Sequence, residues 1–84
     1  MNEKLAAIKR IREELDEEFN RACSTASACF DAQAASLAVA AEGSQRTECD
    51  EAIRLLKSSV NALGEAVDAC AQACTAIDDY LAAT

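Results

Sequence analysis

The chain has 84 residues, no proline, two glycines and a formal net charge of −7. That length allows one small domain, and small domains usually need disulfides, a metal or oligomerisation to become stable. The negative charge argues against nucleic-acid binding, which depends on cationic contacts to phosphate groups. No apolar run is long enough for a membrane span, and the charged N-terminus does not match a signal peptide, so a cytoplasmic protein is expected.

The first predicted element is a helix over about residues 2–41, with apolar positions recurring at helical spacing in one broad stripe. Gln33 lies within this stripe, either as a tolerated polar residue near the loop or as a buried polar group that sets register. Ser24, Thr25 and Ser27 leave an alternative open, in which a third helix begins near residue 25, because hydroxyl side chains compete for backbone hydrogen bonds. The stripe comprises Leu5, Ile8, Ile11, Leu15, Phe19, Ala22, Ala26, Cys29, Phe30, Leu37 and Ala40.

A turn is predicted over residues 42–46, around Gly43. Glycine favours the left-handed backbone conformation with which many helices end. Ser44 or Thr47 can cap the helix that follows, and Glu48 suits the positive N-terminal end of that helix. Since the turn lies near the middle of the chain, two helices of similar length are expected.

The second predicted helix, over about residues 47–83, carries the most regular pattern in the chain. Ten apolar positions alternate in steps of four and three residues, as in the heptads of a coiled coil. Paired against the first helix, this seam predicts an all-α antiparallel helical hairpin that forms a single domain over residues 1–84. The seam residues are Cys49, Ile53, Leu56, Val60, Leu63, Val67, Cys70, Cys74, Ile77 and Leu81.

A second stripe of mostly small residues runs beside that seam, and the outer positions of the first helix near the loop are small as well. Small side chains let two helix axes approach closely. We interpret both sets as an interface in a homodimeric four-helix bundle, with two hairpins packed head-to-tail. The alternatives are that alanine here reflects only helix propensity, or that the chain pairs with a different protein. The second-helix set is Leu55, Ser59, Ala62, Ala66, Ala69, Ala73, Ala76 and Tyr80, and the first-helix set is Ala28, Ala32, Ala35 and Val39.

Five cysteines are the chemical peculiarity of this composition. The facing positions of the predicted hairpin bring no two cysteines of opposite helices together, so an internal disulfide is not expected. Free cysteine packs as a small hydrophobic residue, and filling the core is the favoured interpretation. Cys49 lies in the first turn of the second helix, where the helix dipole favours a thiolate, but neighbouring carboxylates oppose redox reactivity.

Cys70 and Cys74 form the alternative candidate site. At positions i and i+4 they share a helix face, and thiolates are suitable ligands for Cu(I) or Zn(II). A four-thiolate site would require the same pair from a second chain. The Cys-x-x-x-Cys spacing resembles that of copper-storing four-helix bundles whose cores are lined with thiols. Those proteins repeat the spacing many times and often add histidines, neither of which this chain does.

Catalysis is not expected. The chain has no histidine for a Ser–His or Cys–His pair, and it has no glycine-rich phosphate loop. Adjacent carboxylates such as Glu13 and Glu14 fall on exposed helix faces without a pocket around them. The sequence therefore predicts a non-enzymatic protein–protein interaction module without a cofactor, such as a small adaptor, chaperone or regulator. A thiol-based metal-binding bundle is the alternative.

Overall fold

A computed structural model describes residues 3–83. In the described part every element is helical and no strand occurs, so the predicted all-α class is confirmed. None of these helices is both long and apolar enough to span a lipid bilayer. In chain order the elements are α1 (Glu3–Glu14), the π-helical turn η1 (Leu15–Phe19), α2 (Asn20–Ala40) and α3 (Glu48–Ala83).

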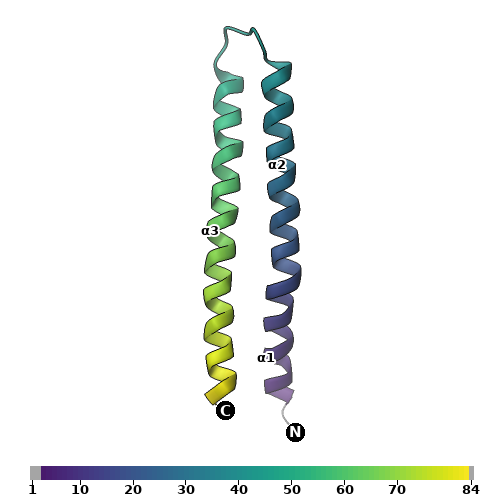
Figure 1. Cartoon of the computed structure of the whole chain (residues 1–84), viewed down its shortest axis with the longest axis vertical. Coiled ribbons are helices and arrows are strands. Elements are labelled where there is room, and N and C mark those ends of the chain that lie inside the picture. The colour runs from purple at the N-terminus through teal and green to yellow at the C-terminus, as the bar shows by residue number, and fades with distance from the viewer. Residues whose placement is uncertain (1–2, 84) are drawn as a thin grey trace.

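The helices form two rods, because α1, η1 and α2 follow one another without a break and α3 runs back along them (Figure 1). The two rods lie side by side and antiparallel, so the described chain begins and ends at the same end of the molecule. All three elements of the first rod contact α3. The Cα atoms extend over 65 × 15 × 12 Å. These dimensions correspond to a single layer of two helices, and no second layer covers it to enclose a core.

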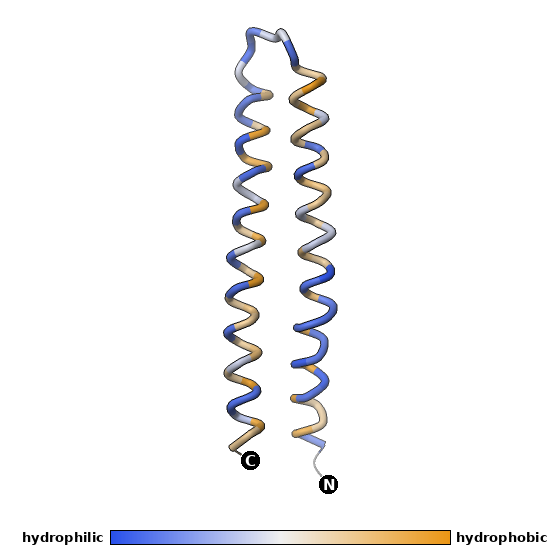
Figure 2. The backbone as a smooth tube through the Cα atoms, in the orientation of Figure 1, coloured by the Kyte–Doolittle hydropathy of each residue, from blue (hydrophilic) through white to orange (hydrophobic). Residues whose placement is uncertain are grey.

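The seam predicted on α3 is the side of that helix with the least exposure. All ten seam residues, from Cys49 to Leu81, are buried or half-buried, whereas most other residues of α3 are exposed. Figure 2 shows the hydrophobic positions of α3 on the side turned toward the first rod. The strict four-three spacing of apolar residues accounts for this arrangement, because it keeps them on one face along the whole helix.

The first rod turns inward most of the predicted stripe, but not all of it, and it also buries residues outside the stripe. Cys23 and Ala34 are buried, with 6% and 4% of their surface exposed, and neither belongs to the predicted stripe. The turn η1 contains more residues than an α-helical turn, which shifts the register of α2 so that Cys23, rather than its neighbour, faces α3. Four members of the predicted stripe are exposed instead: Ile11, Ala22, Cys29 and Ala40.

No helix break occurs near residue 25, because α2 runs through that position without interruption. The three-helix alternative is therefore wrong for the described chain, and the irregularity lies earlier, at η1. A π-helical turn disturbs the regular pairing of each carbonyl with the N–H four residues on. Two carbonyls in η1 accept side-chain hydrogen bonds, Asp16 O from Asn20 Nδ2 at 2.7 Å and Leu15 O from Cys70 Sγ at 3.7 Å. Gln33 is exposed, so it is not a buried polar group within one chain.

The connection between the rods depends on Gly43. Its φ angle is +82°, a left-handed conformation that residues with a side chain adopt only at a cost. The Ser44 hydroxyl accepts a hydrogen bond from the Arg46 N–H within the loop, at 3.2 Å, instead of capping α3. The first backbone bond at the start of α3 runs from the Glu51 N–H to the Thr47 carbonyl, at 3.0 Å.

Candidate interaction surface

The residues predicted to form an interface are exposed in the single chain, except for the half-buried Ser59. Three of them are large apolar side chains, with 72% of Val39, 52% of Leu55 and 53% of Tyr80 exposed. Monomeric proteins also expose single apolar side chains. These residues therefore indicate an interface only if they lie next to one another on one surface. The remaining exposed members are Ala28, Ala32, Ala35, Ala62, Ala66, Ala69, Ala73 and Ala76.

Ile11 extends this surface onto α1. It is 48% exposed, although its hydrophobicity placed it in the predicted inner stripe. Ile11 and Ile8 of α1 line an apolar hollow of about 430 Å³ together with Ala76, Ile77 and Tyr80 of α3. This end hollow lies between the rods, near the end at which the described chain begins and ends. The structure thus joins an isoleucine of α1 to the small-residue stripe of α3.

The small residues of α2 have a different relation to the seam from the stripe of α3. Each of them stands two positions before an inward residue, as Ala35 stands before Leu37, whereas each stripe residue stands one position before, as Tyr80 stands before Leu81. Positions with the same relation to the seam share a face in an antiparallel helix pair. A second shallow hollow near the loop is lined by Ala35, Ser36, Val39 and Ala40. The stripe of α3 together with Ile11 forms the apolar face of the molecule, and the predicted interface residues of α2 lie outside it.

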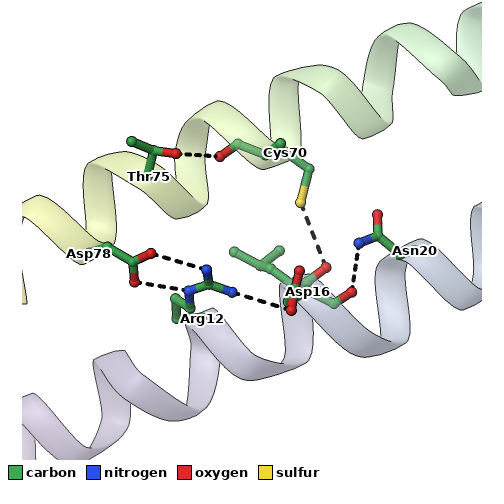
Figure 3. A network of polar contacts seen from close by, with 8 residues as sticks. Arg12, Asp16, Asn20, Cys70, Thr75 and Asp78 are labelled. Carbon is green, nitrogen blue, oxygen red and sulfur yellow. Dashed lines mark hydrogen bonds and ion pairs between the residues drawn. The ribbon is translucent and has the colours of Figure 1, made fainter.

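The opposite face, the polar face, contains an ion pair that connects the two rods. Arg12 Nε and Nη2 donate to Asp78 Oδ1 and Oδ2 at 2.9 and 3.0 Å, and Arg12 Nη1 lies 3.5 Å from Asp16 Oδ2 (Figure 3). The hydrogen bond from Arg12 lowers the pKa of the Asp78 carboxyl. Sequence reasoning missed this pair. The available signal was a pair of opposite charges at levels that face each other in an antiparallel arrangement.

A third hollow, of about 400 Å³, lies on the side of the seam that carries the polar residues. Gly64 forms part of its wall, and a Cβ atom at that position would meet nothing within 4 Å. No other part of the described chain packs so closely against Gly64 that a side chain would be excluded there. The lining residues are Asn20, Cys23, Ser24, Ser27, Val60, Leu63, Gly64 and Val67.

The cysteines are free, and two of them are among the most buried residues of the described chain. Cys23 and Cys74 expose only 6% and 5% of their surface, as expected for thiols that fill a core. Burial raises the pKa of the Cys70 thiol, and the neighbouring Cys74 raises it further. A raised pKa disfavours the thiolate that a soft metal requires.

The predicted metal site brings together two thiols, those of Cys70 and Cys74, within one chain. Among residues 3–83 no group of three or more histidine, cysteine, aspartate or glutamate side chains is arranged to hold a metal ion. Completing a site would require ligands from another molecule. No observation in the single chain favours that site over core packing.

Comparisons of the chain with protein-family models, with curated proteins and with solved structures found no match.

Proposed function

We propose that this chain is a non-enzymatic protein–protein interaction module that acts as a homodimer. Two helical hairpins pair through their apolar faces and form a four-helix bundle. The single observation that supports this most strongly is the surface area left exposed by one chain, 6281 Å². A compact folded protein of 8.9 kDa exposes about 4,800 Å², so this chain exposes about 1,500 Å² in excess.

The excess area matches what a stable dimer buries. Permanent homodimer interfaces bury about 1,000–2,500 Å² on each chain. A single chain has little core of its own, because only Cys23, Ala34 and Cys74 are buried among the described residues. Pairing two layers through their apolar faces adds the second layer that a helical domain normally requires.

Charge favours the apolar face for self-association. The polar face carries the Arg12–Asp78 pair and the carboxylate of Asp16, whereas the apolar face is built from alanine and larger apolar residues. Each chain has a net charge of −7, so pairing two acidic polar faces would bring like charges together. Pairing through the apolar face leaves the polar faces on the outside of the dimer, where a further protein partner of an adaptor, chaperone or regulator would bind.

Sedimentation velocity at micromolar concentration tests the dimer. We expect the unmutated chain to sediment as a dimer and the double variant Ala69→Glu with Ala73→Glu to sediment as a monomer. Both alanines are exposed in the single chain, and a buried unpaired carboxylate is strongly unfavourable in an interface.

The matched control is Ala71→Glu with Thr75→Glu, which adds the same two charges on another side of the same helix turns. This control should remain dimeric. A folded, unmutated chain that sediments as a monomer would refute the proposed function.

A further inference from the structure

We infer that the two copies pair antiparallel and in one register, with the twofold axis beside Ala66 and with Leu55 of each copy seated in the end hollow of the other. The inference rests on the proposed homodimer and specifies how the two apolar faces meet.

Two face-to-face arrangements are compatible with twofold symmetry. If the axis runs along the rods, both loops lie at the same end, the two end hollows face each other, and Leu55 of each copy lies far from the partner's end hollow. If the axis crosses the rods, each loop lies at the open end of the partner, and α3 packs antiparallel against the partner's α3. Only the second arrangement brings Leu55, an exposed apolar side chain that does not itself line the end hollow, to the end hollow of the other copy.

Spacing along α3 supports the crossed arrangement. Leu55 stands eleven positions before Ala66, and Ile77 of the end hollow stands eleven positions after it. At 1.5 Å per residue each lies about 16 Å from Ala66 along the helix axis. An axis at Ala66 therefore brings Leu55 of one copy to the level of the partner's end hollow.

The same axis makes the stripe of α3 complementary to itself. It sets Ala62 within one position of the partner's Ala69 and Leu55 within one position of the partner's Ala76, so that Leu55 meets a small side chain. All four residues are exposed in the single chain, which leaves them available for contact. Close-packed interfaces favour such pairing of large with small residues.

The end hollow is large enough for the incoming side chain. Its volume is about 430 Å³, and a cavity of about 150 Å³ lined by apolar side chains already accommodates a benzene ring. Its walls are Ile8, Ile11, Ala76, Ile77 and Tyr80, so a leucine there would lose its exposure to water without meeting a charged group.

The first rod fits the same axis. Two contacts show which residues of the two rods lie at the same height along the molecule. Cys70 contacts Leu15, and Asp78 contacts Arg12. They place Ala66 beside residues 19–24 of the first rod. An axis at that level brings Ile11 of one copy to the level of Cys29, Gln33 and Ser36 of the other copy, which share its face and are exposed.

Disulfide trapping tests this register. Cys29→Ser, Cys49→Ser and Cys70→Ser first remove the three thiols that are not fully buried, and Ala66→Cys is then added. Mild oxidation should link the two copies through residue 66, because a twofold axis places it beside itself. Leu55→Cys with Ala76→Cys should also link, whereas Leu55→Cys alone and the control Ala71→Cys should not. Circular dichroism verifies that each variant is folded.

A second measurement uses Leu55 itself. Leu55→Ala should raise the dissociation constant of the dimer at least about tenfold, whereas Leu55→Met, which still fills the hollow, should change it far less. A dimer in which Ala66→Cys fails to link and Leu55→Ala binds normally would overturn this register but leave the homodimer standing. A monomeric unmutated chain would overturn both.

Discussion

Arg12 combines two functions at one position of α1. It occupies a level of the inner seam at which an aliphatic residue would ordinarily pack, and its side chain is only 28% exposed. Its aliphatic stem can cover apolar surface, while the guanidinium reaches both oxygens of Asp78 on the other rod. The fork of two parallel hydrogen bonds fixes both distance and direction. This pair therefore ties α1 to α3 near the open end, where the rods have few other contacts.

The pair makes stability depend on pH. The pKa of Asp78 is lowered in the folded chain by the hydrogen bond from Arg12. The contribution of ionised Asp78 is therefore present above the pKa of an unfolded aspartate, about 3.9, and is lost as the pH falls through the lower folded value. We expect Asp78→Asn to lower the melting temperature at pH 7, and we expect the difference from the unmutated chain to shrink as the pH falls below about 3.9. Thermal melts followed by circular dichroism measure it.

Asp79→Asn is the matched control for that experiment. Asp79 is exposed, is adjacent in the sequence and forms no ion pair in the described part of the chain. The Asp79→Asn substitution removes the same negative charge from an acidic protein, so its effect on the melting temperature measures any general relief of charge repulsion. The assignment would be contradicted by an equal loss of stability in both variants at pH 7.

At the scale of elements, the turn η1 determines which side of α2 faces inward. The inward positions Leu15, Phe19 and Cys23 are separated by two successive steps of four residues, whereas α3 alternates four with three. That irregular spacing was visible in the sequence, but its structural meaning was not. A stripe drawn at a constant 100° per residue follows Ala22 and Cys29 instead, and both are exposed. The wide turn changes that angle locally.

Replacing the two glycines by alanine should change the stability of the protein in opposite directions. Gly64 lies inside α3 with open space around a Cβ, so Gly64→Ala should stabilise the protein by about 0.5–1 kcal/mol through helix propensity. Gly43 has a φ of +82°, so Gly43→Ala should destabilise it by about 1 kcal/mol or more.

Urea denaturation of both glycine variants at one protein concentration measures these changes, because the unfolding of a dimer depends on concentration. A loss of stability in Gly64→Ala would show that some group packs closely against that position after all.

At the scale of the whole molecule, stability should depend on association. If folding and pairing are coupled, the melting temperature rises with protein concentration. It should also rise between about 20 mM and about 0.5 M NaCl, because salt screens the repulsion between two chains of charge −7. Scanning calorimetry over a hundredfold range of concentration measures the first effect. The variant Ala69→Glu with Ala73→Glu should show no such dependence, and an unmutated chain whose melting temperature is independent of concentration would contradict the coupling.

The sequence by itself determined that the described chain is all helical, that a connection falls around Gly43, and which side of α3 is least exposed. These properties follow from helix propensity, from one glycine and from a strict apolar period, all of which act locally along the chain. Only the tertiary structure decided that Cys23 and Ala34 are buried, that Arg12 reaches Asp78, and that Ile11 joins the apolar face. Those properties depend on the π-helical turn and on the relative level of two rods. The relative position of the two rods along their axes is determined by contacts between residues far apart in the sequence, and a local sequence pattern cannot predict it.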